Sequence, residues 1–403
     1  MVDAGQPSCF WLCCPSFYFV ALQFCKEDPP HLAVRMVSSR RHPSPFYTAL
    51  GGEYVADCPS ASLLREVTIS SRIETRLQRF SNILRKMSPS QQTHFKLLQK
   101  FKPEYSPSEF VQYESERTGM RVVVIDQQGP KVTGYFVLAT EITDDSGAPH
   151  TLEHLCFMGS RNYRYKGFLD KLATRVYSST NAWTATDHTA YTLDTAGWEG
   201  FAEILPIYLE HVIAPTLTDE GCYTEVHHID GTGNDAGVVY SEMQGVQNNA
   251  AELMDLAARR LTYPPGVGFR YETGGMMEQL RVLSAERIRE FHREMYQPRN
   301  LCLVITGEVD QAHMLEVLDK FEDTILDVIP SPESPFKRPW VDSKQTPPLE
   351  KSVLSRVEFP EEDESFGEIE IRFLGPDCSD PVQCQYPPLH PSGSLKGSDI
   401  CDK

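Results

Sequence analysis

Apolar residues in the central part of the chain form short runs rich in β-branched and aromatic side chains. Such runs, bounded by glycine, proline and aspartate, are typical of β-strands. They predict strands over 121–125, 132–143, 179–186, 189–193 and 301–306. The turn residues at 126–130 separate the first two strands and predict that these two form a β-hairpin.

Between the strands, apolar residues recur three and four positions apart, which is the spacing of a buried helix face. Helices are predicted over 149–158, 168–176, 201–212, 236–262, 284–295 and 310–326. Pro149 suits the first position of a helix, Ser284 suits an N-cap, and Pro206 should kink the helix that contains it. Because strands come in adjacent pairs with helices between the pairs, we expect an α+β fold, in which helices pack on one face of an antiparallel sheet.

The character of the sequence changes four times, which divides the chain into five parts. Residues 1–104 mix cysteine-rich apolar sequence with prolines and are expected to be a poorly ordered leader of uncertain structure. Residues 105–329 hold the predicted strands and helices, and prolines crowd a linker at 330–350. A second, incomplete domain is expected to start at 351–375, followed by a disordered tail at 376–403.

Composition and charge argue against a nucleic-acid-binding protein and a membrane protein. The 403 residues are 40% hydrophobic and 23% charged, as in an ordinary globular chain. A formal net charge of −18 repels phosphate, so we expect no nucleic-acid partner. The longest apolar run, Phe10–Cys25, is shorter than the roughly 20 residues that a membrane helix needs. Pro15 also interrupts it, so no membrane partner is expected.

Cysteine usage bears on the compartment. The eleven cysteines include no CxxC pair and are widely scattered, which favours a reducing environment over a disulfide framework. We therefore expect a cytoplasmic protein. The mitochondrion is the alternative, because Arg35, Arg40, Arg41 and several serines give the leader some transit-peptide character.

The strongest chemical signal is His150-Thr-Leu-Glu153-His154, at the start of a predicted helix. Residues four apart lie on one helix face, so the two imidazoles can converge on a single ion. Zinc accepts imidazole nitrogen and leaves one of its four positions to water in catalytic sites. Glu153 flanks the same face and can take a proton from that water. The pattern is HxxEH, the inverted form of the HExxH zinc motif.

A catalytic zinc needs a third protein ligand, and a carboxylate on a second helix is a natural source. Glu242, within the run 237–245, is the best candidate because it lies on a predicted helix with an apolar side. The rivals are Glu225, His227, His228 and Glu210, and spacing does not choose among them.

Three motifs in order carry a family resemblance: PHTLEHLCFMGS at 149–160, NAWTATDHTAY at 181–191 and GVVYSEMQG at 237–245. Together they resemble the pitrilysin and insulin-degrading-enzyme family of inverted-zincin metallopeptidases, in its presequence-protease-like branch, over residues 105–375. The resemblance implies a domain like that of the mitochondrial processing peptidase, followed by a truncated second copy. Residues 105–329 would then be the zinc-binding metallopeptidase domain.

The resemblance also implies roles for individual residues. One Zn²⁺ per chain would be held by His150, His154 and Glu242, with Glu153 as the catalytic base. Asp235 would be the acidic residue that supports the zinc-binding histidines. Asn181 and Ala182 would belong to the edge strand that binds the backbone of a peptide substrate, because an extended peptide can add to a sheet edge.

Two functions follow as expectations. The first is a zinc-dependent metalloendopeptidase that hydrolyses peptides or unfolded segments through a zinc-activated water, with Glu153 as general base. The alternative is a non-catalytic peptide-binding or interaction protein of the same superfamily, inactive because the second half is missing. The expected partners are a peptide substrate and a complementary C-terminal half or homologous domain.

Overall fold

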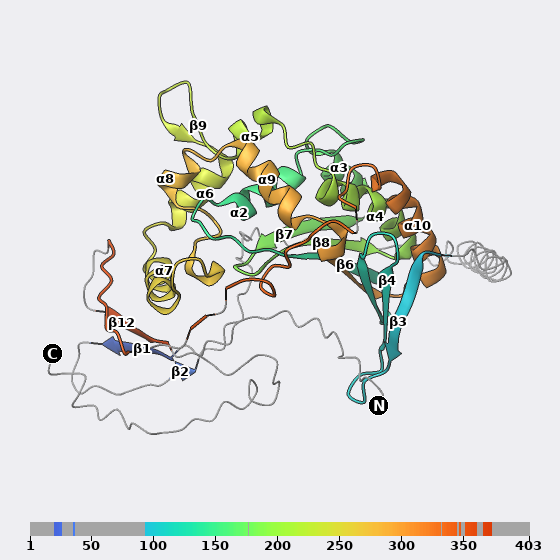
Figure 1. The fold of residues 1–403 in the computed structure, drawn as a ribbon, viewed down its shortest axis with the longest axis horizontal. Helices are drawn as coiled ribbons and strands as arrows, with labels where there is room; N and C mark the ends of the chain where they lie inside the picture. Colours follow the sequence, from blue (N-terminus) through green and yellow to red (C-terminus); the bar gives the residue numbers. More distant parts are fainter. Residues whose placement is uncertain are drawn as a thin grey trace, which may run out of the picture. The chain divides into compact units, whose positions relative to one another are not determined.

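Figure 1 shows the computed structural model of the chain. It describes residues 93–372, apart from 176, 332, 345, 348–350 and 361–365, together with two short upstream strands. The tail expected at 376–403, and the leader apart from those two strands and residues 93–104, lie outside the described residues. The upstream strands are β1 (Val20–Cys25) and β2 (Arg35–Met36), and β1 pairs with β2 and with β12 (Phe366–Ile371).

The centre of the fold is a seven-stranded sheet with the strand order β3-β4-β5-β11-β6-β8-β7. Its strands are β3 (Phe95–Phe101), β4 (Glu109–Ser115), β5 (Arg121–Asp126), β6 (Lys131–Ala139), β7 (Ser178–Thr184), β8 (His188–Ala196) and β11 (Leu301–Gly307). Every neighbouring pair is antiparallel except β5 and β11, which are parallel. Buried positions alternate along β5, β6 and β11, which places one face of the sheet in the core.

The hairpin predicted for the first two strands is wrong. The turn after β5 does reverse the chain, but β11 lies between β5 and β6 and bonds to both. Turn residues predict that the chain reverses direction, but they do not predict which strand pairs with which. The partner β11 is far away in sequence, so no local pattern could indicate it. The sheet also starts at Phe95, before the expected start of the domain at 105. The sequence did not predict β3, because this strand is mostly exposed and lacks the alternation of apolar and polar residues that marks a half-buried strand.

The helices confirm the predicted α+β class. Five helices in the described part of the chain form the layer on the sheet, where each packs on a strand or on another helix of the layer. They are α2 (Ala148–Cys156), α3 (Phe168–Arg175), α4 (Trp198–Ile213), α9 (Ala285–Met295) and α10 (Gln311–Ile325). Figure 1 shows α2, α3, α4 and α9 on the same side of the sheet. The core between the layers combines aliphatic side chains with aromatic pairs: Phe136 of β6 stacks on Tyr208 of α4, with ring centroids 4.6 Å apart.

Of the remaining elements, α5 and α6 pack against α2. The full set is α5 (Asp219–Glu225), β9 (His228–Ile229), β10 (Asp235–Ala236), α6 (Val238–Val246), α7 (Ala250–Thr262), η1 (Gly268–Arg270), α8 (Met277–Leu280) and η2 (Pro298–Asn300). The single helix predicted over 236–262 is two helices, because Asn249 accepts a hydrogen bond from the Ala251 amide and caps the second. Ser284 caps α9 as predicted, accepting from the Arg287 amide.

Trp340, within the expected proline-rich linker, is bound to the domain. Its indole nitrogen donates to the carbonyl oxygens of Thr140 at 2.8 Å and Asp187 at 3.1 Å, and its ring packs on Phe269 with centroids 4.2 Å apart. Among the described residues, no helix is both long and apolar enough to cross a bilayer.

The buried histidine of α9, His292, should make the stability of the fold depend on pH. His292 of α9 donates from Nε2 to the Val212 carbonyl oxygen at 3.1 Å, and burial lowers the pKa of His292 to about 4. The unfolded chain binds this proton near pH 6.5 and the folded chain only near 4. The free energy of unfolding should therefore fall as the pH drops through this window, by about 2–3 kcal/mol.

Denaturant titrations of the parent and of His292→Gln at several pH values between 6.5 and 4 measure this effect. Glutamine keeps an amide donor but does not titrate, so the variant should show a flatter dependence. Equal slopes in the two proteins would exclude His292 as the source of the acid sensitivity.

Candidate metal centre

The beginning of α2 is fixed by a close backbone contact. Gly147 precedes the helix with φ of 76°, and a Cβ there would lie 2.8 Å from the Gly274 carbonyl oxygen and from the Gly275 Cα. Only glycine tolerates both the left-handed backbone and this approach. Pro149 lies in the first turn, where its missing N–H costs no helical hydrogen bond. The motif therefore starts at a defined point on the helix, with Leu152 and Leu155 buried behind it.

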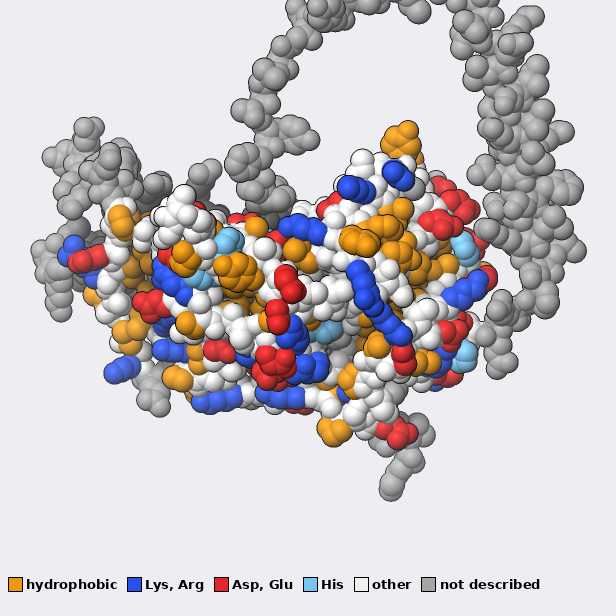
Figure 2. Space-filling model, turned by 90° about the horizontal axis from the view of Figure 1, so that it is seen from above, with side chains coloured by type: hydrophobic (Ala, Val, Ile, Leu, Met, Phe, Trp, Pro, Cys, Tyr) orange, Lys and Arg blue, Asp and Glu red, His pale blue; other side chains and the backbone are white. Residues whose placement is uncertain are grey.

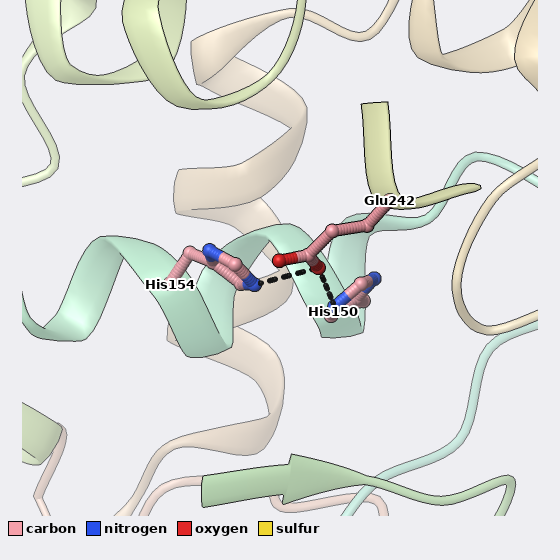
Figure 3. Close-up of side chains that lie close together, drawn as sticks. All are labelled: His150, His154 and Glu242. Atoms are coloured by element: carbon pink, nitrogen blue, oxygen red, sulfur yellow. Dashed lines mark ion pairs between the residues drawn. The ribbon is translucent and has the colours of Figure 1, made fainter. Parts of the chain in front are cut away.

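His150, His154 and Glu242 converge on one point. The Nε2 atoms of both histidines lie 3.4 Å from the same carboxylate oxygen, Oε2 of Glu242. One ligand atom from each of the three residues lies within 4.8 Å of the others. Figure 3 shows the two imidazoles on α2 facing the carboxylate that α6 presents. Two imidazole nitrogens and one carboxylate oxygen are the donors that zinc takes in catalytic sites, so the residues fit the ion.

The electrostatics of this cluster also suit a cation. Hydrogen bonds to His150 and His154 hold the pKa of the Glu242 carboxyl well below its usual range. Burial disfavours the charged form of His154, but its hydrogen bonds to Glu225 and Glu242 prevail and raise its pKa to about 9. Without a metal, a proton on the imidazole balances the carboxylates. Zinc requires the neutral imidazole, so its binding would displace that proton.

Asp235, which the resemblance assigns to supporting the zinc-binding histidines, has its side-chain partners elsewhere. Its carboxylate bonds to His227 Nε2 at 2.7 Å, to the Tyr240 hydroxyl at 3.0 Å and to Arg281 at 3.0 Å. The carboxylate beside the histidines is that of Glu225, whose Oε2 lies 3.7 Å from Nδ1 of His154. Glu225 is the last residue of α5, and it is 5% exposed. Proximity along the chain to Glu242 favoured Asp235, whereas packing of α5 on α2 brings in Glu225.

The other rivals for the third ligand have structural roles. Glu210 is buried and accepts hydrogen bonds from the Ser160 hydroxyl, the Asn162 amide and the Asn162 side chain at 2.7–2.8 Å. His227 bonds to Asp235, and Nδ1 of His228 lies 3.1 Å from the Tyr223 carbonyl oxygen.

Glu153 lies next to the cluster with its carboxylate enclosed. It is 9% exposed, and Oε2 accepts a hydrogen bond from the Thr184 hydroxyl at 2.5 Å. Burial raises the pKa of Glu153, and the bond from Thr184 opposes that rise. A raised pKa suits a carboxylate that takes up a proton and releases it again. Sequence reasoning did not single out Thr184, since only the packing of α2 on β7 brings it to Glu153.

Asn181 and Ala182 lie on β7, the strand at the edge of the sheet nearest α2. The Asn181 carbonyl oxygen accepts from the Thr192 hydroxyl at 3.3 Å and from the Tyr208 hydroxyl at 3.5 Å. The Asn181 side chain accepts from the Ala182 amide at 2.9 Å. The strand leads directly to Thr184, so an extended peptide paired with this edge would pass beside Glu153.

Two stretches of the chain match models of known protein families. Residues 139–250 match the family described as insulinase, peptidase family M16, and residues 283–384 match the peptidase M16 inactive domain. The first range contains His150, Glu153, His154, Glu225 and Glu242. Both matched models belong to peptidase family M16, so the comparisons support the resemblance to the pitrilysin and insulinase peptidases.

Individual relatives divide into two groups. An uncharacterized Saccharomyces cerevisiae protein, YOL098C, is 47% identical over 71% of this chain and 28% of its own length. An uncharacterized Caenorhabditis elegans protein, C05D11.1, is 41% identical over 66% of this chain and 27% of its own. Presequence protease 1, chloroplastic/mitochondrial, of Arabidopsis thaliana is 28% identical over 56% of this chain and 22% of its own. The chain thus spans about a quarter of the length of these relatives.

Among solved structures, a protease from Helicobacter pylori aligns with a TM-score of 0.49 at 19% identity, over 59% of this chain and 55% of its own. Pitrilysin aligns with a TM-score of 0.48 at 18% identity, over 66% of this chain and 26% of its own.

Proposed function

We propose that the chain is the metal-binding part of a zinc-dependent metalloendopeptidase. The observation that carries the proposal is the convergence of His150, His154 and Glu242 on one point beside the buried carboxylate of Glu153. When bound, zinc polarises the scissile carbonyl and makes a water molecule acidic enough to act as the nucleophile near neutral pH.

The chain's own residues supply the remaining chemistry. Glu153 takes a proton on its carboxylate and delivers it to the leaving amine, and Thr184 holds that carboxylate at Oε2. The edge of β7 at Asn181 and Ala182 binds the peptide backbone, which gives affinity with little demand on sequence. A docking peptide would replace the hydrogen bond between the Ala182 amide and the Asn181 side chain.

The expected substrates are peptides or unfolded segments, since only an extended backbone can pair with a strand edge. A complementary C-terminal half or a homologous domain is the expected protein partner, because the relatives are about four times longer than the matched part. We retain the cytoplasm as the proposed compartment, with the mitochondrion as the alternative because the presequence proteases among the relatives are mitochondrial or chloroplastic. On the face in Figure 2, acidic and basic side chains are interspersed.

Metal analysis tests the site. Protein stripped with chelator and reloaded should hold one zinc per chain, and Glu242→Ala and His150→Ala should each hold far less. Glu252→Ala, which changes an exposed carboxylate on α7, is the matched control and should keep the parent's stoichiometry. Retention of zinc by Glu242→Ala would point to another ligand and overturn the assignment.

The second candidate function is a non-catalytic peptide-binding or interaction protein. The match of residues 283–384 to the inactive domain of the family favours it. A zinc-loaded chain that binds a peptide and cleaves none, even with the complementary half added, would support this alternative.

A further inference from the structure

The loop between α2 and α3, residues 159–167, is held in place by the protein. Gly159 starts it with φ of 136°, and a Cβ there would lie 2.9 Å from the carbonyl group of Arg164, so the loop folds tightly back on itself. The Ser160 amide donates to the Tyr163 carbonyl oxygen at 2.9 Å. Buried Glu210 binds both Ser160 and Asn162, as described above.

The second half of the loop is fixed by aromatic packing. The Tyr163 ring stacks on Phe168 with centroids 4.9 Å apart, and it also packs on His211 at 6.2 Å. Gly167, with φ of 73°, then turns the chain into α3. The backbone at Lys166 is therefore held in one conformation by the loop, although most of the lysine side chain is exposed.

Lys166 ends at the candidate metal centre. Its Nζ donates to Oε1 of Glu225 at 2.6 Å, while the other oxygen of that carboxylate faces Nδ1 of His154 at 3.7 Å. The exposed fraction is 64% for the lysine side chain and 6% for the glutamate side chain. One enclosed carboxylate thus lies between a lysine from the loop and a histidine from α2.

We infer that Lys166 is a positioning residue of the metal centre, which fixes the orientation of Glu225 and through it the ring of His154. The inference rests on the proposed function. A histidine that binds a metal through Nε2 usually donates from Nδ1 to a partner, and loss of such a partner typically lowers metal affinity by about 10–100-fold. Glu225 can serve as that partner only while its second oxygen is held.

Two effects of removing Lys166 oppose each other. Loss of its positive charge should favour a divalent cation, but the ammonium is largely in water, where the interaction is weakened by solvent and salt. Loss of the hydrogen bond leaves one oxygen of an enclosed carboxylate unpaired and free to reorient. Because the carboxylate is enclosed and the lysine is exposed, the second effect should dominate, and zinc should bind about tenfold more weakly.

Competition of the full chain with a chromogenic chelator for Zn²⁺ tests this. Lys166→Met should raise the dissociation constant about tenfold, and Lys166→Arg should restore most of the affinity. Lys171→Met, on an exposed lysine of α3, is the matched control and should bind as the parent does. Thermal melting of the metal-free proteins should be nearly equal, since Lys166 is exposed.

Two further measurements separate positioning from a general charge effect. In the Glu225→Gln background, Lys166→Met should have little additional effect on zinc affinity, because Lys166 acts only through the Glu225 carboxylate. The visible spectrum of the Co²⁺-loaded protein should shift in Lys166→Met and be restored in Lys166→Arg. Parent-like zinc affinity and cobalt spectrum in Lys166→Met, with zinc lost in Glu242→Ala, would overturn this inference and leave the proposed function standing. Zinc retained in Glu242→Ala would overturn both.

Discussion

Glu153→Gln is expected to lower the rate of peptide hydrolysis by about 10²–10⁴-fold, the usual size of a general-base contribution, while zinc stays bound. Glutamine has nearly the same shape and can still accept the hydrogen bond from Thr184, so the packing of α2 on β7 should persist. It has no basic oxygen near pH 7, so it cannot take up a proton. Glu153 is also not among the three converging ligands, so the metal site should remain complete.

A quenched fluorogenic peptide and metal analysis on the same preparations measure the two quantities. If the isolated chain is slow, the parent and the variant are compared again with the complementary half of a longer relative added. Parent-like cleavage by Glu153→Gln would remove Glu153 as the base. Equal loss of zinc and activity would instead assign it a structural role.

Gly237→Ala should destabilise the metal centre and the fold around it. Gly237 precedes α6 with φ of 135° and ψ of 145°, and a Cβ there would lie 2.3 Å from the carbonyl oxygen of Val226. The same oxygen accepts a hydrogen bond from the Tyr240 amide at 3.2 Å. Val226 directly follows Glu225, so this contact sets the separation between the elements that carry Glu225 and Glu242.

An alanine at 237 must both adopt an unfavourable backbone and push α6 away from Val226. Backbone strain of about 1–3 kcal/mol and overpacking of about 1–3 kcal/mol predict a loss of about 2–6 kcal/mol in unfolding free energy. Zinc affinity should fall with it, because Glu242 moves with α6.

Gly245→Ala is the matched control for this change. It lies on the same helix, without a positive φ, and nothing lies within 4 Å of the added Cβ. Alanine should be neutral or slightly stabilising there, since it is the better helix former. Denaturant unfolding and zinc competition on both variants measure the effect, and equal behaviour of the two would refute the role of the close contact.

Local patterns were sufficient for most single elements. The positions of α2, α4, α9 and β8 follow from periods of 3.6 and 2 that depend only on the backbone geometry of each element. Strand partners did not follow, because pairing is decided by packing between segments that are distant in sequence. The insertion of β11 between β5 and β6 is the clearest case.

The candidate site divides along the same line. The sequence by itself determined that His150, Glu153 and His154 share a helix surface, because helical geometry relates residues three and four apart whatever surrounds them. Only the tertiary structure brought Glu242 rather than its rivals to both imidazoles, placed Glu225 instead of Asp235 beside His154, and set Thr184 and Lys166 around the carboxylates. Those contacts join α2, α5, α6, β7 and a loop, and their distances depend on how whole elements pack, which no local spacing encodes.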